Sequence, residues 1–363
     1  MKTLIFEPNL NGHHLEYLHH IYSRASVEHE NQFIFAVPES FHNLRDKFDW
    51  NKAENIYFIY LSENKLQNKL KTNIELLKII LKHQPENTFL ISLIWYMPFI
   101  VFLLFLGTKI SGIIYNIYLY EWKYSNWKTK VKNTILYTLL SKCPNISNLF
   151  ILNDSSSVCV LNKIWKTRRF KYLPDPFVSI NTNKSHFLRR ELGIGNNKTI
   201  FLHFGAMSAR KGTLQIFNMI ENTNVHTLEN ICVIFAGKVG KDIKEQFYNK
   251  YNLLKDKVKI IIDDEFIDYE RIGSYLLTCD YVLLPYTYTS LSSGVIGYCA
   301  QFNKPAIGPN RGLLGKLIRK NRLGLVLDRF ESFDNLHCQY KENEYCKKRS
   351  VDVFTNIIFN NLT

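Results

Sequence analysis

The chain has 363 residues, 46% of them hydrophobic, which is enough for two domains with separate cores. Its formal net charge of +14 predicts attraction to polyanions: nucleic acid, anionic lipid or phosphorylated substrates. The seven cysteines form no CxxC pair and no His/Cys zinc spacing, which argues against a zinc module or a disulfide scaffold and fits a reducing compartment.

The N-terminus has the pattern that begins a doubly wound domain. Thr3–Phe6 is an apolar strand, Glu7–Gly12 is a loop, and a helical apolar period follows from His14. The first apolar run is too short for a signal peptide, so we expect a cytoplasmic protein. Ligands of such domains bind at the carboxyl ends of strands. The candidate residues there are Gly12, His13, His14 and Glu16. The alternative is a polar helix start, with the Glu16 carboxylate at the positive end of the helix.

Further strands and helices follow. The predicted strands are Phe33–Val37 and Ile56–Tyr60. Ser62–His83 has its apolar residues on one face and predicts an amphipathic helix.

The segment 87–108 carries no charged residue and is in principle long enough to span a bilayer. Pro98 interrupts it, so we favour a strand at Phe89–Ile94 and an apolar helix at Pro98–Leu106, partly facing lipid. A strand at Ser111–Tyr118 would complete a βαβ unit.

Two stretches interleave basic and aromatic residues, Trp122–Lys132 and Lys163–Lys171. Such a mixture suits an anionic membrane surface, and it equally suits single-stranded nucleic acid. No RNA-binding signature accompanies the stretches, so we predict a membrane surface and no nucleic-acid partner. A plain solvated basic face is the third alternative.

The segment Tyr172–Phe177, which contains two prolines, separates two βα series and is the predicted domain boundary. We expect an N-terminal domain over residues 1–174, a C-terminal domain over 178–345, and a C-terminal helix within 346–363.

The segment Thr199–Gly212 is the first candidate binding motif of the C-terminal half. Its apolar residues form a strand that ends at Gly205, and Arg210 and Lys211 precede a helical pattern. A point charge and a planar guanidinium at such a turn are natural partners for a diphosphate. The alternative is a solvated surface pair.

The second candidate motif is Asp280–Pro305. It reads as a buried strand that ends at Pro285, a polar loop, the turn Ser292-Ser293-Gly294, and an apolar helix from Val295. A small, hydroxyl-rich turn that leads into a helix suits an anion, because backbone N–H groups are exposed there. An ordinary strand-to-helix turn would look the same.

Together, the two motifs resemble retaining glycosyltransferases of family 4. The shared features are the strand glycine Gly205, the pair Lys211-Gly212, Asp280 before the second strand with Pro285 after it, and Lys304-Pro305. The resemblance covers most of the C-terminal half and extends more weakly to the N-terminal half. It implies an α/β protein of the GT-B fold, with two doubly wound Rossmann-like domains facing a central cleft.

The sequence departs from this family at several positions. Ala206 stands where an Arg is common, and Arg210 is a possible substitute for it. The family's paired glutamates fall on Ser290, at the donor sugar, and on Tyr298, at the nucleotide ribose. Ser293-Gly294-Val295 looks like a branch of the family with a Ser-Gly-Val loop.

The resemblance implies a hexosyltransferase that retains anomeric configuration, uses a nucleotide-sugar donor, and acts on a lipid-linked or growing glycan in cell-surface polysaccharide biosynthesis. We expect it at the inner face of the plasma membrane, with no metal or other cofactor. The implied donor diphosphate site is Gly205, Arg210, Lys211, Ser292, Ser293, Gly294 and Val295. Phe266 and Ile267 lie in the loop that holds the base, and Gly12, His13, His14 and Glu16 would line the acceptor side. No catalytic base is assigned, and the C-terminal helix would cross back to the N-terminal domain.

Two other functions stay open. A nucleotide-sugar 2-epimerase shares the GT-B fold but needs an acid/base pair of carboxylates, which the sequence does not offer clearly. A catalytically inactive partner subunit would explain the missing glutamates.

Overall fold

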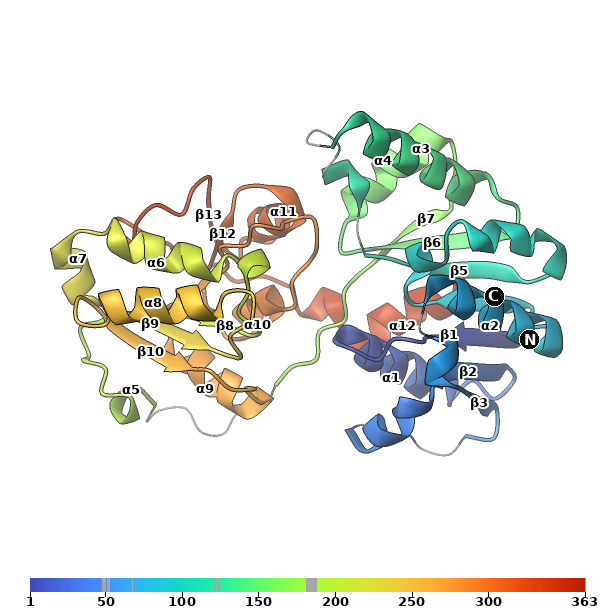
Figure 1. The fold of residues 1–363 in the computed structure, drawn as a ribbon, viewed down its shortest axis with the longest axis horizontal. Helices are drawn as coiled ribbons and strands as arrows, with labels where there is room; N and C mark the ends of the chain where they lie inside the picture. The colour runs from blue at the N-terminus through green and yellow to red at the C-terminus, as the bar shows by residue number, and fades with distance from the viewer. Residues whose placement is uncertain are drawn as a thin grey trace. The chain divides into compact units, whose positions relative to one another are not determined.

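The computed structural model describes residues 1–47, 50, 53–66, 68–115, 117–120, 122, 125–180 and 188–362. The chain divides into two compact units. Unit 1 comprises Met1–Pro176 and Arg349–Thr363, and unit 2 comprises Phe177–Lys348. Each unit is a parallel β-sheet covered by helices (Figure 1).

Within the described residues, the sheet of unit 1 has seven strands in the order β3-β2-β1-β4-β5-β6-β7. The strands are β1 (Lys2–Phe6), β2 (Gln32–Pro38), β3 (Ile56–Leu61), β4 (Asn87–Leu90), β5 (Lys109–Ile114), β6 (Ile146–Leu152) and β7 (Phe170–Leu173). The central strands are buried on both faces, which explains why they read as continuous apolar runs rather than as alternating patterns.

Helices cover both faces of this sheet. They are α1 (His13–Ala25), α2 (Lys69–His83), α3 (Trp127–Lys142), α4 (Ser155–Trp165) and α12 (Val351–Phe359). One apolar core joins the sheet to α2 and α3, and the other joins it to α1 and α12. Phe354 and Ile358 of α12 are fully buried in the second core beside Leu18 of α1, so the last helix packs on unit 1.

Unit 2 has, in its described part, a six-stranded sheet in the order β10-β9-β8-β11-β12-β13. The strands are β8 (Thr199–Phe204), β9 (Ile231–Ala236), β10 (Lys259–Asp263), β11 (Tyr281–Leu283), β12 (Ala306–Pro309) and β13 (Gly324–Leu327). The helices are α5 (Leu188–Glu191), α6 (Thr213–Glu221), α7 (Val225–Glu229), α8 (Lys244–Leu254), α9 (Tyr269–Thr278), α10 (Val295–Gln301) and α11 (Gly312–Lys320).

The apolar segment 87–108 differs from the prediction in detail. After the short strand β4 it forms two 3-10 helices, η3 (Leu93–Tyr96) and η4 (Phe99–Leu106), in place of one α-helix. Pro98 lies between them and supplies no N–H for a continuous helix, and Gly107 ends the second one with φ 70°. In the part of the chain that is described, no helix has the length and apolarity needed to cross a membrane.

Candidate functional site

The two sequence motifs of unit 2 meet where its strand order reverses. β8 and β11 are parallel neighbours, so Gly205 and Pro285 follow adjacent strands at the carboxyl edge of the sheet. This is the position at which open α/β sheets bind their ligands. Thr287 ties the two loops together, since its N–H and its hydroxyl donate to the Arg210 carbonyl at 3.1 and 3.0 Å.

Close packing of these loops explains the glycine that follows the two cations. Gly212 has φ 66°, and a Cβ atom built on it would lie 1.8 Å from the Pro285 carbonyl oxygen. Any other residue would push the two loops apart. Loop packing therefore explains Gly212 of the Lys-Gly pair. Lys211 is not explained by this packing and is the candidate for a function.

The Lys211 ammonium lies beside Gly205, on the side where a Cβ atom would stand. A Cβ atom on Gly205 would be 2.8 Å from the Lys211 Nζ, which also lies 5.7 Å from the centre of the Tyr286 ring. Burial, and next the charge of Arg210, lower the pKa of Lys211 to about 8. Among the described residues no carboxylate stabilises this cation. A half-buried cation without an acidic partner is costly, so this position favours a bound anion.

Tyr286 links Lys211 to the serine-rich turn. Its ring faces the ammonium, and its hydroxyl lies 3.2 Å from the Ser293 Oγ. The Val295 N–H donates to the same Ser293 Oγ at 3.4 Å, and Gly294 has ordinary right-handed φ and ψ angles. The structure thus brings Lys211 and Ser293 around one buried tyrosine, whose pKa burial raises to about 12.

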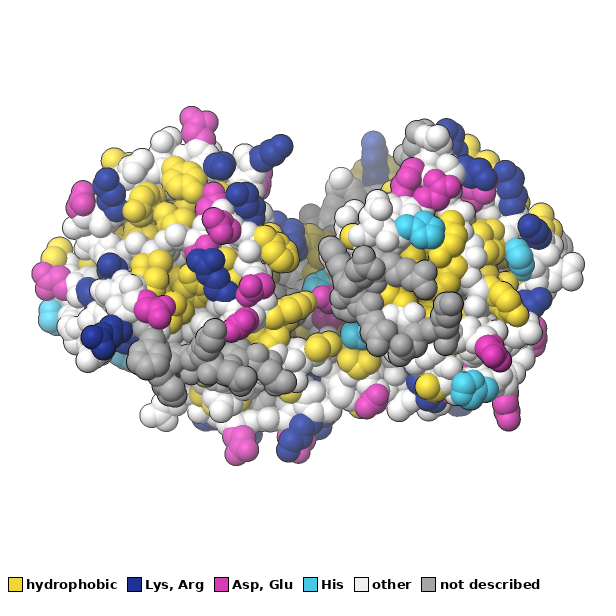
Figure 2. All heavy atoms as spheres, turned by 90° about the horizontal axis from the view of Figure 1, so that it is seen from below, with side chains coloured by type: hydrophobic (Ala, Val, Ile, Leu, Met, Phe, Trp, Pro, Cys, Tyr) yellow, Lys and Arg dark blue, Asp and Glu magenta, His cyan; other side chains and the backbone are white. Residues whose placement is uncertain are grey.

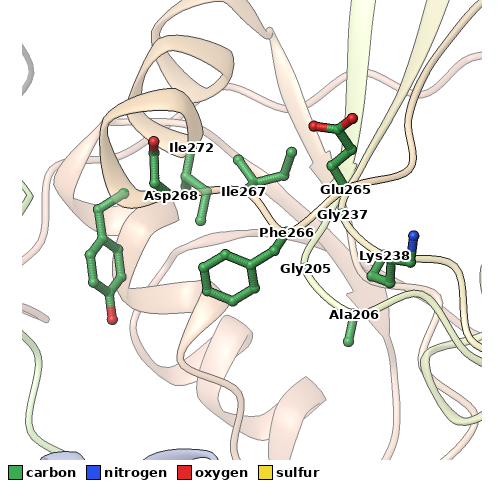
Figure 3. Close-up of a pocket in the computed structure, with 10 residues that line it drawn as sticks. Gly205, Ala206, Gly237, Lys238, Glu265, Phe266, Ile267, Asp268 and Ile272 are labelled. Atoms are coloured by element: carbon green, nitrogen blue, oxygen red, sulfur yellow. The ribbon is translucent and has the colours of Figure 1, made fainter. Parts of the chain in front are cut away.

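A cavity of about 390 Å³ begins beside Gly205. It is lined by Gly205, Ala206, Gly237, Lys238, Glu265, Phe266, Ile267, Asp268, Tyr269 and Ile272. Figure 3 shows the Phe266 ring standing in this space, between the segment at Ile267 and the side chain of Ala206. Phe266 is 92% exposed, which is exceptional for a phenylalanine and makes its ring available to a planar ligand. The volume lies within the range of small-ligand pockets, about 300–1,000 Å³.

The loops that line the cavity are held by close backbone contact and by Asp264, which pairs with Lys238 and Lys244. A Cβ atom on Gly237 would lie 2.3 Å from the Gly205 carbonyl oxygen, so the loops after β8 and β9 touch there. Asp264 accepts from the Val239 N–H at 2.7 Å and from the Tyr248 hydroxyl at 2.9 Å. These bonds anchor the loop that carries Phe266 and Ile267.

The neighbouring Asp263 is also occupied, by the Arg271 guanidinium at 2.7 Å and the Tyr275 hydroxyl at 2.8 Å. Over the described residues, no group of three His, Cys, Asp or Glu side chains is arranged to hold a metal ion. Metal independence stays a prediction.

The other residues predicted for the donor site lie around the cavity rather than in its wall. Arg210 is exposed beside Lys211, and Ser290 and Val295 are buried in the loop and at the start of α10. The Tyr298 ring packs against Phe177 at 5.2 Å between ring centres and against Phe204 at 6.2 Å.

The predicted acceptor residues lie in unit 1, at the start of α1. Gly12 caps the helix with φ 62°, and the His13 Nδ1 lies 3.4 Å from the Glu16 carboxylate at the surface. The His14 Nδ1 lies 3.0 Å from the buried Glu7 carboxylate. Burial raises the pKa of Glu7, and His14 acts against this rise.

Sequence reasoning missed the polar groups that surround these residues. The Tyr17 hydroxyl donates to Asp175, which follows β7, and the Tyr115 hydroxyl is buried without a hydrogen-bond partner among the described residues. In unit 2 it missed Tyr286 and the cavity residues of α9. The apolar run before Pro285 was a signal for the strand, but nothing in it distinguished Tyr286 from a loop aromatic.

Comparison with known proteins identifies the fold of the chain. No protein-family model matches the sequence, and no curated protein sequence matches it. Solved structures do match it. The Anabaena HepE structure in complex with UDP is 14% identical, with a TM-score of 0.66, and covers 100% of this chain and 96% of its own. WaaG, a glycosyltransferase involved in lipopolysaccharide biosynthesis, is 11% identical, with a TM-score of 0.60 and coverage of 100% and 90%. OtsA, as an apo structure, is 10% identical, with a TM-score of 0.68 and coverage of 100% and 99%.

The chain has the GT-B fold. The similarity extends over both units, so the prediction of two doubly wound α/β domains is confirmed. HepE of Anabaena has also been solved with UDP-glucose. Membership of family 4 and of its Ser-Gly-Val branch stays a prediction.

Proposed function

We propose that the protein is a glycosyltransferase that moves a hexose from a nucleotide sugar to a lipid-linked or growing glycan. The observation that carries this proposal is the Lys211 ammonium, which lies beside Gly205, at the edge of an aromatic cavity, without a carboxylate among the described residues. A nucleoside diphosphate matches both the aromatic cavity and the cation, since it combines a planar base with a negatively charged diphosphate. The GT-B fold and its known complexes with UDP and UDP-glucose in HepE support this choice.

The donor would lie along unit 2. Its diphosphate would contact Lys211 and Arg210, with the turn at Ser293 beside it, and its base would stack on Phe266. Charge develops on the diphosphate as the glycosidic bond breaks, and a fixed cation stabilises that charge most in the transition state. Loss of one such contact typically costs about 2–4 kcal/mol of transition-state stabilisation.

The finer features of the proposal rest on the resemblance to family 4. They are retention of the anomeric configuration, independence of metal ions, and a donor phosphate that takes the acceptor proton. The acceptor would lie at the start of α1, near His13 and Glu16. A role in cell-surface polysaccharide biosynthesis at the inner face of the plasma membrane agrees with the net charge of +14, since anionic lipid attracts such a protein.

A second function is favoured by one observation. Ser290 stands where family 4 has a glutamate at the donor sugar, and it is only 5% exposed. A protein without that carboxylate could bind the donor and not transfer it, as an inactive partner subunit. Donor affinity without turnover would identify this alternative.

The proposal is tested with a panel of nucleoside diphosphates and nucleotide sugars in a thermal-shift assay, because a ligand of the native state raises the unfolding temperature. The bound nucleotide sugar is then incubated with glycan acceptors, and the product is examined by NMR. We expect a shift with at least one nucleoside diphosphate and a product of retained configuration. No shift with any nucleotide would overturn the donor site, and an inverted product would overturn the family mechanism.

A further inference from the structure

The positive charge of the chain is concentrated in one part of unit 1. Residues 87–174 contain eleven Lys or Arg and two acidic residues, a net charge of +9 out of the chain's +14. Elsewhere the two signs are mixed, as on the face of the molecule shown in Figure 2. This segment contains α3 and α4, which pack against each other (Figure 1).

Helix α3 is apolar on two different faces. Tyr137 and Leu140 are buried in the core of unit 1. Trp127, Val131 and Ile135 follow each other at intervals of four residues, so they form one stripe along the helix. These three side chains are 69%, 48% and 56% exposed, although no ordinary surface helix needs such a stripe.

Beside this stripe lies a second cavity of unit 1, an apolar groove of about 470 Å³ between α3 and the turn at Met97-Pro98. The groove is lined by Met97, Pro98, Trp127, Lys128, Val131, Lys132, Ile135, Leu136 and Leu139. Its apolar lining suits a flexible aliphatic chain. Trp95, which is 52% exposed, stands close to the same turn.

Lysines surround the groove, and within the described ranges none of them has an acidic partner. Lys128 and Lys132 line it directly. Lys69 lies at its edge, since its Nζ donates to the Met97 carbonyl at 2.6 Å and lies 5.9 Å from the centre of the Trp95 ring. Burial, and next the charge of Lys132, lower the pKa of Lys69, as expected for cations gathered without a counter-ion.

We propose that α3 docks the protein on an anionic bilayer, with its apolar stripe among the acyl chains, one chain in the groove, and phospholipid phosphates on Lys69, Lys128 and Lys132. The apolar stripe matches the acyl chains of such a lipid, and the lysines match its phosphate. Nucleic acid would use the cations and the tryptophan but gains little from Val131 and Ile135, which offer no face for base stacking. This inference assigns the membrane contact of the proposed function to one helix, and it rests on residues outside the donor site.

Of the predicted membrane stretch Trp122–Lys132, Lys123 and Tyr124 lie outside the described residues. The proposal rests on α3, which contains the end of this stretch from Trp127 onward, together with Met97-Pro98 and Lys69.

The test is co-sedimentation with vesicles of phosphatidylcholine, alone or mixed with phosphatidylglycerol. We compare the wild type, the double variant Val131→Ser with Ile135→Ser, and a control with Val225→Ser and Leu253→Ser. The control removes two aliphatic side chains that are 72% and 70% exposed in unit 2. All four positions are exposed, so folding is retained, and the UDP-dependent thermal shift checks this for each variant.

We expect wild-type binding to the anionic vesicles alone, at least tenfold weaker binding of the α3 variant, and less than twofold change in the control. The double variant Lys128→Glu with Lys132→Glu should lose binding as well. Equal losses in the α3 variant and the control would overturn the proposal, as would wild-type protein that ignores anionic vesicles but binds single-stranded RNA. Absence of a thermal shift with every nucleoside diphosphate of the panel, with vesicle binding intact, would instead refute the donor site and leave the docking surface standing.

Discussion

Replacing Lys211 by Met should weaken nucleotide binding and at the same time stabilise the free protein. Methionine keeps the apolar stem and removes the charge. UDP serves as the probe because HepE has been solved with it. A hydrogen bond to a charged group contributes about 1.5–3 kcal/mol, so we expect this probe to bind about 10- to 100-fold more weakly. The expected stabilisation of the free protein follows from the pKa of Lys211, which falls from 10.5 to about 8 on folding.

A lowered lysine pKa means that the folded protein binds this proton less well than the unfolded chain. The resulting destabilisation is fully present below pH 8 and fades as the pH rises from about 8 to 10.5. Each pKa unit corresponds to about 1.4 kcal/mol, but solvent reaches part of the side chain and Tyr286 offsets part of the cost. We therefore expect the variant to be more stable by about 1 kcal/mol at pH 7, or about 2–4 °C in unfolding temperature.

Isothermal titration calorimetry with UDP and a thermal melt without ligand measure the two effects. Lys255→Met is the matched control, because Lys255 is exposed at the end of α8 and should change neither quantity. Unchanged UDP affinity in the Lys211 variant would refute the placement of the diphosphate. A lower unfolding temperature would refute the inference that this cation lacks an acidic partner.

Three further outcomes are expected. UDP affinity of the wild type should fall as the pH rises above about 8, because Lys211 then loses its proton, and titrations across this range should show no such fall in Lys211→Met. Gly212→Ala should destabilise unit 2 by about 3 kcal/mol or more in urea unfolding, because its Cβ would overlap the Pro285 carbonyl; a stable variant would contradict the loop packing. His13→Ala and Glu16→Ala should lower glycan transfer and leave UDP affinity unchanged in calorimetry, and a loss of UDP affinity would contradict their assignment to the acceptor.

The sequence predicted the fold because the strands of a parallel sheet are continuous apolar runs. β8 and β11 were recognisable for this reason, and the glycine or proline after each strand marked the edge at which the site lies. The segment 93–106 was predicted less well. It is apolar all round, so it has no periodicity that could separate one α-helix from two 3-10 helices around Pro98.

The interior of the site depends on contacts between residues far apart in the chain, and no local pattern encodes them. Tyr286 is a loop aromatic in the sequence, yet its ring and hydroxyl connect Lys211 to Ser293. The spacing could place two cations after Gly205, but it could not show that Lys211 is half-buried with no carboxylate beside it among the described residues. Likewise, Tyr17 and Asp175 lie 158 residues apart and share one partly buried hydrogen bond.

The ionisable groups at the carboxyl edges of the two sheets differ in their partners, and this difference supports different ligands for the two units. At the carboxyl edge of unit 1, Glu7 is matched by His14, and Asp175 accepts a hydrogen bond from Tyr17. At the corresponding edge of unit 2, the described residues leave Lys211 unmatched. An anionic ligand gains most where a cation is already desolvated and unpaired, since no existing ion pair has to be broken. We therefore expect a diphosphate to bind unit 2 with a net gain in free energy. We expect unit 1, where Glu7 and Asp175 are already hydrogen-bonded, to suit a neutral hydroxyl-bearing acceptor, for which the buried Tyr115 hydroxyl offers a hydrogen-bonding group without a partner among the described residues.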